Sequence, residues 1–215
     1  MGDLATLGLL AATAAVSYLI GSFSSGFVVG KLYRNVDLRR VGSGSTGATN
    51  TLRTLGLGAA ALVGILDIAK GALAVFLAHA LLPSAEWRPV AEALAGTFVV
   101  AGHCWPVTLQ GRGGRGIATG FGALLFIASP TALFAIVFFG VAVALTRIVS
   151  VGSLSSVVGA LVGYLVASWL GVVPFHWAPL AFIVIGGAIV YVRHLDNIRR
   201  LIAGREPRLG EPIRS

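Results

Sequence analysis

The chain has little charge and almost no cysteine. Cys104 is the only cysteine, so no disulfide framework can form within the chain. Charged residues make up 11% of the 215 positions and hydrophobic residues 56%, with a mean hydropathy of +0.90. These values argue against a soluble globular domain, and the abundance of apolar residues excludes intrinsic disorder. The composition therefore predicts a fold that uses a membrane as its solvent.

Long apolar stretches dominate what is present. A bilayer core about 30 Å thick takes roughly 20 residues of helix. We therefore expect an all-α integral membrane protein with about seven transmembrane helices, forming a single polytopic domain over residues 1–215. The fourth and fifth stretches are short and flank Ser129-Pro130, so they could be tilted, re-entrant or one bent helix. The stretches run from Leu4 to Val29, Leu55 to Leu82, Val90 to Leu109, Ile117 to Ala128, Thr131 to Thr146, Val151 to Val172 and Ala178 to Val192.

The cations gather in alternate junctions between these stretches. All of the 16 Lys and Arg residues except Lys70 and Arg88 fall in residues 31–53, 112–115 and 147 or in the tail from 193. The positive-inside rule places these segments in the cytoplasm and the N-terminus outside. The cytoplasmic side would then hold glycine-rich loops at about 31–54 and 110–116 and the tail 193–215. A plainer interpretation is that the cations only set topology and attract anionic lipid.

The first of these loops is rich in glycine and hydroxyl groups. Residues Gly42 to Gly47 satisfy G-x-G-x-x-G, but a dinucleotide site needs a preceding buried strand, and here a membrane helix precedes the motif. Glycines still allow backbone N–H groups to converge on an anion. Ser43 and Asn50 would add hydrogen bonds and Arg53 a positive charge. Close helix packing through small residues is the alternative interpretation.

The second loop has the same character. It begins like a P-loop at Gly111, but Ile117 stands where that motif needs Lys, which disfavours nucleotide triphosphates. Arginine keeps its proton near neutral pH, so its role here would be electrostatic. We expect the loop to hold a phosphate at the start of the next helix. The residues predicted for this site are Arg112, Gly113, Gly114, Arg115 and Gly116.

Two phosphate sites on one face indicate two phosphorylated ligands, or one ligand that moves between sites. In the tail, His194 and Asn197 are three residues apart and would share a helical face if the helix continues, with Arg199 and Arg200 turned elsewhere. His194 could be catalytic or only a polar anchor at the boundary.

Other polar residues lie at the edges of the spans or within them. Ser150, near Arg147, could contact a ligand or cap a helix. Within the second span, Asp67 and Lys70 are spaced to form an ion pair, which could be structural or functional.

The sequence lacks the residue patterns that metal binding and covalent nucleophilic catalysis need. The face expected to be cytoplasmic has no acidic pair and no His/Cys cluster, so we expect no metal and no cofactor. There is no G-x-S-x-G elbow, which weakens covalent acyl-enzyme catalysis. Cys104 is disfavoured as a nucleophile because neighbouring His103 would face another side of a helix.

Motifs along almost the whole chain resemble the bacterial acyl-phosphate-dependent glycerol-3-phosphate acyltransferases, integral membrane enzymes that begin phospholipid synthesis. The motifs are GSFSSGF near Gly21, GSGSTGATNTLRTLG from Gly42, DIAKG from Asp67, GHCWPV followed by GRGGRGIATGFG, the Ser150 to Ser153 junction, and RHLDNIRRL with GREPRLG. Two departures are Ser45, where that family often has Asn, and arginines instead of lysines in the second loop.

The resemblance implies attack by a glycerol-3-phosphate hydroxyl on a long-chain acyl phosphate, giving 1-acyl-glycerol-3-phosphate (lysophosphatidic acid) and phosphate. It implies an enzyme of the bacterial inner membrane whose partners are these two substrates and membrane lipid, without nucleic acid. Carried over by motif, Ser43, Asn50 and Arg53 would line one phosphate site, Arg112 to Gly116 would cover a phosphate, and Ser150 would contact substrate. His194 and Asn197 would position or help deprotonate the hydroxyl.

Two alternatives stay open. A transporter of an organic phosphate also suits short helices and basic glycine loops, although no internal repeat relates the two halves of the chain and the cations gather at one face. A membrane scaffold that only recruits acidic lipid would tolerate neutral replacement of Asn50 and His194.

Overall fold

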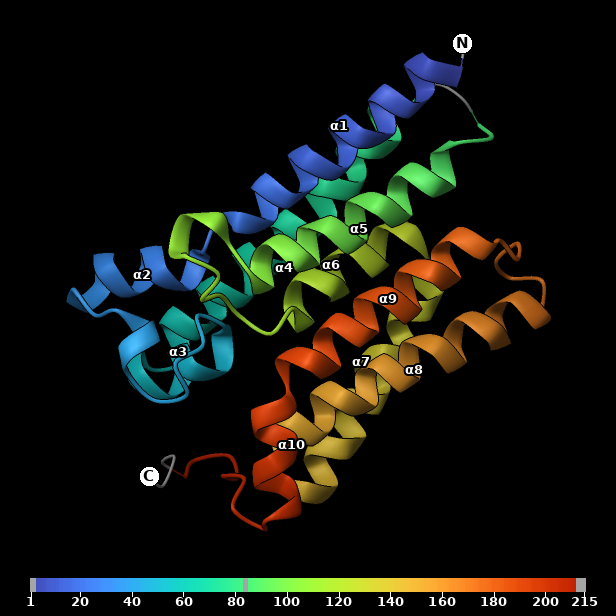
Figure 1. Ribbon diagram of the computed structural model, residues 1–215. Helices are drawn as coiled ribbons and strands as arrows, with labels where there is room; N and C mark the ends of the chain where they lie inside the picture. The colour runs from blue at the N-terminus through green and yellow to red at the C-terminus, as the bar shows by residue number, and fades with distance from the viewer. Residues whose placement is uncertain (1–2, 83–84, 212–215) are drawn as a thin grey trace.

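The computed structural model describes residues 3–82 and 85–211, which form a bundle of α-helices (Figure 1). Arg214 and the rest of the predicted tail beyond residue 211 lie outside the described residues. The bundle is built from α1 (Asp3–Ser22), α2 (Ser25–Arg34), α3 (Ala48–Leu55), α4 (Leu57–Leu81), α5 (Arg88–Cys104), α6 (Ile117–Ile127), α7 (Ser129–Thr146), α8 (Val149–Trp169), α9 (Trp177–Arg193) and α10 (Leu195–Ile202), with the short 3₁₀ helices η1 (Leu38–Arg40) and η2 (Val107–Leu109).

The helices are long and apolar enough for an integral membrane protein, as the composition predicted. Among the described residues, five segments could cross a membrane by length and hydropathy, and a sixth could if α9 and α10 form one bent span. α6 has 11 residues and so rises only roughly 16 Å, about half of a bilayer core. The fourth predicted span is therefore a half-length helix. α6 and α7 are separate helices joined at Ala128.

Two of the long apolar segments are interrupted in the structure. The first apolar stretch divides into α1 and α2, where Ser24 caps α2 by accepting from the Phe27 N–H at 3.4 Å. The sequence left open whether the last span continues as a helix into the tail, and α9 and α10 meet at a bend of 60° at His194. Hydropathy alone shows neither break, because the residues on both sides remain compatible with helix.

Glycines bring the helices into close contact. On α1 and α5, a Cβ on Gly21 would overlap the Val99 carbonyl, and one on Gly102 would overlap the Tyr18 carbonyl. Gly71 of α4 and Gly122 of α6 make the same kind of reciprocal contact. Backbones that approach this closely gain dispersion contacts along the whole crossing, which lipid cannot supply.

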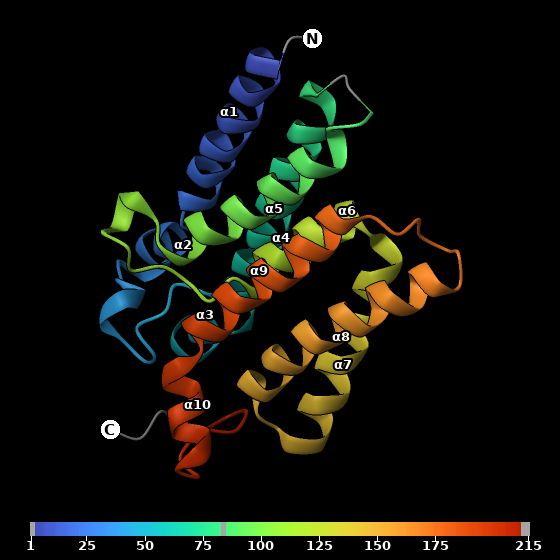
Figure 2. The same ribbon diagram turned by 45° about the vertical axis from the view of Figure 1, so that its right-hand side comes forward.

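The polar segments gather at one end of the bundle. The start of α1 lies at the opposite end from α10, and α2, α3 and the loop after α5 lie near α10 (Figures 1 and 2). The chain beyond α10 also reaches the α7–α8 turn, where the Leu209 N–H donates to the Arg147 carbonyl at 2.7 Å. All the segments that the charge pattern assigned to one face therefore meet in space.

Candidate active site

A polar cavity of about 200 Å³ lies where these segments meet. It is formed by both glycine-rich loops, the start of α8 and the residues around α10. Its walls contain Ser45, Gly47, Ala48, Thr49, Asn50, Arg53, Asp67, His103, Arg115, Gly116, Ile117, Ala118, Phe139, Val149, Ser150, Ser153, His194, Asn197 and Glu206. Residues from four distant parts of the sequence, including seven of the eleven predicted site residues, thus share one space.

Asn50 organises the first loop. Its Nδ2 lies 2.9–3.1 Å from the carbonyl oxygens of Leu38, Val41 and Ser45, and its Oδ1 accepts from the Ser43 N–H at 2.9 Å. The side chain of Asn50 is therefore committed to the loop backbone. Gly42 permits this because its φ is +58° and a Cβ there would overlap Asn50 Oδ1.

The second loop is clamped between two side chains. The Gly114 N–H donates to the His103 carbonyl at 3.0 Å, and the His103 ring leaves no room for a Cβ on Gly114. From the other side, the Arg193 guanidinium donates to the carbonyls of Gly114 and Gly113 at 3.1 and 3.3 Å. The clamp directs the next residue, Arg115, into the cavity wall.

The two cavity arginines keep their charge at neutral pH. Burial lowers the pKa of Arg115 to about 10, with Glu206 opposing the shift and neighbouring arginines adding to it. Burial also lowers the pKa of Arg53, which Glu206 again opposes. Two partly desolvated guanidinium groups in one cavity favour an anionic ligand.

Three helices begin at the cavity wall. Ala48 opens α3, Ile117 opens α6 and Val149 opens α8, and all three residues line the cavity. Within the described part of the chain, none of these helices has a side-chain cap on its first N–H groups. Uncapped N–H groups and the positive ends of the helix dipoles attract anions. Only the start of α6 was predicted to act in this way.

His194 is the single residue that joins α9 to α10, and it is 1% exposed. Its Nδ1 lies 2.8 Å from the Val190 carbonyl, an acceptor, so Nδ1 carries the proton. In the neutral ring, Nε2 is then a hydrogen-bond and proton acceptor. The helix does not continue straight through His194, but His194 and Asn197 line the same cavity.

Glu206 is a site residue that the sequence pattern did not single out. Its Oε1 accepts from Ser150 Oγ at 2.8 Å and from Asn197 Nδ2 at 2.5 Å, and its Oε2 accepts from Arg200 Nε at 2.7 Å. We expected Arg200 to point away from the face that His194 and Asn197 share. Its guanidinium instead binds the same carboxylate as Asn197. The signal in the sequence was an acidic residue between Arg205 and Arg208 of the tail.

The contact with Glu206 fixes the orientation of the Asn197 amide. A carboxylate only accepts hydrogen bonds, so the amide NH₂ must face Glu206. Asn197 Oδ1 is then buried without a hydrogen-bond partner among the described residues. A buried acceptor of this kind suits a ligand hydroxyl.

The remaining predicted residues lie beside the cavity. Arg112 is exposed, and Gly113 and Gly114 are buried under the clamp. Ser43 contributes its N–H to Asn50, while its hydroxyl is buried without a partner among the described residues. The structure thus separates the predicted set into residues that face the cavity and residues that shape the loops around it.

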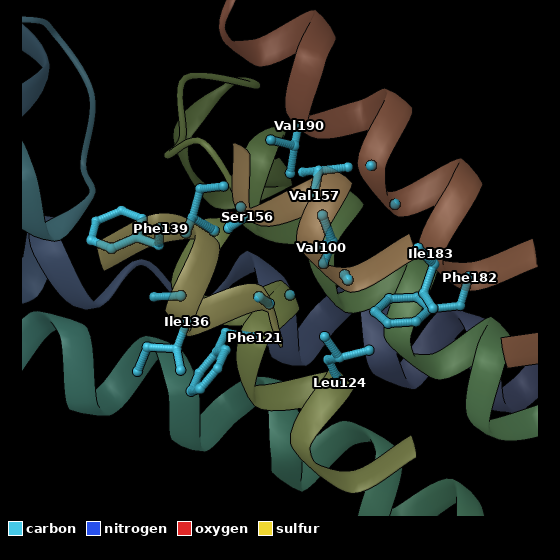
Figure 3. Close-up of a pocket in the computed structure, with 18 of the residues that line it drawn as sticks. Val100, Phe121, Leu124, Ile136, Phe139, Ser156, Val157, Phe182, Ile183 and Val190 are labelled. Carbon is cyan, nitrogen blue, oxygen red and sulfur yellow. The ribbon is translucent and has the colours of Figure 1, made fainter. Parts of the chain in front are cut away.

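A second cavity, of about 260 Å³, lies beside the first in the apolar part of the bundle and is lined by the side chains drawn in Figure 3. The two cavities share the wall residues Gly116, Ile117, Ala118 and Phe139. Apolar side chains from α5 to α9 surround the second cavity, including Val100, Leu124, Ile136, Val157 and Phe182. The pair of cavities can therefore accept a molecule with an anionic head and a hydrocarbon chain.

Comparisons with known proteins agree with this arrangement. A family model described as glycerol-3-phosphate acyltransferase matches residues 11–204. The glycerol-3-phosphate acyltransferase of Synechococcus sp. strain CC9902 is 42% identical over 94% of this chain and 96% of its own length. That of Synechococcus sp. strain JA-2-3B'a(2-13) is 46% identical over 90% of this chain and 92% of its own.

Solved structures give the same result. The crystal structure of PlsY, an integral membrane glycerol 3-phosphate acyltransferase, in its glycerol 3-phosphate form has a TM-score of 0.82 and 32% identity, covering 94% of this chain and 96% of that one. The lysophosphatidic acid form has a TM-score of 0.80 and 30% identity, covering 94% and 95%. From its sequence over nearly its full length and from its fold, this chain belongs to the glycerol-3-phosphate acyltransferase family.

Proposed function

We propose that this protein transfers an acyl chain from a long-chain acyl phosphate to the 1-hydroxyl of glycerol-3-phosphate. The hydroxyl oxygen attacks the acyl carbonyl carbon, the bond from that carbon to the phosphate oxygen breaks, and phosphate leaves with the bonding electrons. The hydroxyl proton passes to His194 Nε2 or to a substrate phosphate. The products are 1-acyl-glycerol-3-phosphate and inorganic phosphate.

The junction of the two cavities is the observation that carries this proposal. A polar space with two arginines and three helix N-termini adjoins an apolar space within the bundle and shares four wall residues with it. The first matches two phosphate groups, and the second matches an acyl chain that stays among the helices. An acyl phosphate is a mixed anhydride and is already activated for acyl transfer. Alignment of the substrates and stabilisation of charge can therefore supply much of the rate enhancement.

The cavity residues divide into three roles. Arg53, Arg115 and the N–H groups of α3, α6 and α8 hold the phosphates, while Asn50 and Gly113 to Gly116 shape the loops that present them. Ser150 and Asn197, both joined to Glu206, provide hydrogen bonds near the reacting groups. His194 provides the acceptor for the attacking hydroxyl.

The arrangement of the chain also supports a topology. α1, α4, α5, α7, α8 and α9 would cross the membrane and α6 would cross half of it, so one of the seven helices expected from the charge pattern is a half-pass. The N-terminus would lie outside and the site at the cytoplasmic side of a bacterial inner membrane. The gathering of the cation-rich segments at one end of the bundle supports this orientation (Figure 1).

Phosphate release by the purified protein tests the reaction. With palmitoyl phosphate and glycerol-3-phosphate together, we expect equal amounts of phosphate and lysophosphatidic acid. Withholding glycerol-3-phosphate should abolish both. Phosphate release that does not need glycerol-3-phosphate would contradict transfer, and uptake of labelled glycerol-3-phosphate into liposomes without acylation would support a transporter instead.

A further inference from the structure

A buried charged cluster lies between the two glycine-rich loops. Asp67 and Lys70 of α4 and His103 of α5 are each no more than 6% exposed. Lys70 Nζ lies 2.9 Å from Asp67 Oδ1 and 2.9 Å from His103 Nδ1. Asp67 and His103 reach the cavity wall, but Lys70 does not. Contact with substrate therefore does not explain the cluster as a whole.

On one side, the cluster holds the chain that supports the first loop. Asp67 Oδ1 accepts from Ser25 Oγ at 2.5 Å, and Lys70 Nζ donates to the Phe23 carbonyl at 2.8 Å. Both contacts fall at the break between α1 and α2. The next residue, Gly26, packs so closely on the Thr46 carbonyl of the first loop that a Cβ would overlap it. The cluster thus fixes the surface on which the first loop rests.

On the other side, the cluster orients the support of the second loop. The Lys70 ammonium has donors and no acceptor, so His103 Nδ1 accepts and the ring proton of the neutral form lies on Nε2. The Nε2 side of the ring lies against Gly114, whose N–H is bound to the His103 carbonyl. The angle of this ring therefore determines where Gly114, and with it Arg115, can lie.

We propose that Asp67, Lys70 and His103 are positioning residues that set the separation between the two glycine-rich loops and so align the two phosphate-bearing substrates. The inference rests on the proposed transfer reaction. Transfer between two bound molecules depends steeply on their alignment, and a displacement of about 1 Å can cost about 100-fold in rate. Each loop can still bind its own phosphate when the separation changes, so the effect falls on kcat more than on KM.

Two variants break the cluster without leaving a lone buried charge. His103→Asn keeps an acceptor for Lys70 but removes the ring that supports Gly114. Asp67→Asn combined with Lys70→Met removes both charges together, because removal of one partner alone would strand the other. His79→Asn is the matched control, since His79 lies near the far end of α4 and contacts Glu92 at 2.7 Å.

Steady-state kinetics on folded, monodisperse protein gives the first test. We expect both cluster variants to lose at least about 10-fold in kcat, with the KM for glycerol-3-phosphate changed less than about threefold, and the control to match the wild type. A wild-type kcat in folded His103→Asn overturns the inference. So does a loss of activity that follows the loss of folded protein.

The distance between the loops gives a second test that needs no turnover. Spin labels on cysteines introduced at exposed Arg40 and Arg112, in a Cys104→Ala background, report the separation of the two loops. We expect a narrow distance distribution in the parent and a shifted or broader one in both cluster variants. An unchanged distribution overturns the inference. A changed distribution in a protein that transfers no acyl group would remove the proposed function and leave the positioning role standing.

Discussion

His194 offers one nitrogen to a ligand, because the other donates to the Val190 carbonyl. Replacement by Gln removes the imidazole acceptor while keeping a polar side chain. General-base catalysis contributes about 100-fold or more, so kcat should fall by about that factor while the protein stays folded. Initial rates of phosphate release with saturating substrates measure the effect. His79→Gln should leave the rate unchanged, and a wild-type rate in His194→Gln would remove this residue from the chemistry.

Glu206 should contribute to both activity and stability. Glu206→Gln places an amide where three donors converge, so we expect a loss of about 1–3 kcal/mol in the free energy of unfolding together with a lower kcat. Glu211→Gln is the control, because exposed Glu211 accepts from the Arg208 N–H, three residues before it in the chain. Thermal unfolding in detergent, followed alongside phosphate release, separates the two effects. Equal unfolding temperatures for the two variants would contradict the role given to Glu206.

The contribution of Glu206 to stability should depend on pH. Burial raises the pKa of Glu206, but hydrogen bonds from Asn197, Ser150 and Arg200 outweigh it, and the net pKa lies below the ordinary value. A lowered pKa in the folded state means stability that is present above the ordinary Glu value of about 4.3 and is lost as pH falls through the folded-state pKa. The unfolding temperature of the wild type should therefore drop more between pH 6 and pH 3 than that of Glu206→Gln.

Patterns of single residues predicted part of this site. Arg53, Arg115, Ser150, His194 and Asn197 were recognisable because charge or hydrogen-bonding groups sat beside glycine or at span ends. Glu206 was not, since an acidic residue between arginines in a basic tail has the pattern of a solvated surface. The part that Asn50 plays in the loop also could not be predicted, because its four backbone partners are defined only once the loop has folded.

Glycines in the loops act in two physically different ways. Gly111 has a φ of +76° and open space around it, whereas Gly114 has no room for a Cβ beside His103. Gly111→Ala should cost about 1–2 kcal/mol of stability from backbone strain and leave kcat nearly unchanged. Gly114→Ala should displace the loop and lower kcat at least about 10-fold. Similar kcat values for the two variants would show that the close contact with His103 is unimportant.

The apolar cavity should select the length of the acyl chain. Ala160 of α8 is buried in the cavity wall, so Ala160→Leu reduces the space for a hydrocarbon chain. We expect kcat/KM for palmitoyl phosphate to fall relative to that for octanoyl phosphate, by about 10-fold or more, since lost methylene contacts each carry about 0.8 kcal/mol. Ala144→Leu, on the exposed face of α7, is the control. An unchanged ratio would place the acyl chain elsewhere.

The helices were predicted well where a long apolar stretch marks the helix. They were predicted poorly where contacts of buried polar groups determine where a helix ends. Most spans fall close to the expected ranges. The break between α1 and α2 depends on Lys70 and Asp67, which lie more than 40 residues away. The convergence of α3, α6 and α8 at one cavity depends on tertiary packing that no local pattern contains.

Cysteine labelling can test the proposed orientation of the whole bundle across the membrane. In a Cys104→Ala background, single cysteines at exposed Leu4 and Arg40 occupy opposite ends of the bundle. In intact cells, a membrane-impermeant maleimide should label the cysteine at position 4, while the one at position 40 should need permeabilised cells. Labelling of both positions from the same side would contradict the crossing of α1 and the proposed orientation.

The docking of the tail on the α7–α8 turn has a consequence for biogenesis. Glu206 and Leu209 follow every apolar helix in the chain, yet Glu206 completes the wall of the cavity and the Leu209 N–H binds the Arg147 carbonyl in the turn. A nascent chain that has inserted its helices still lacks the Glu206 carboxylate that binds Ser150 and Asn197. We therefore expect the cavity to be completed only after the segment that follows α10 has been synthesised.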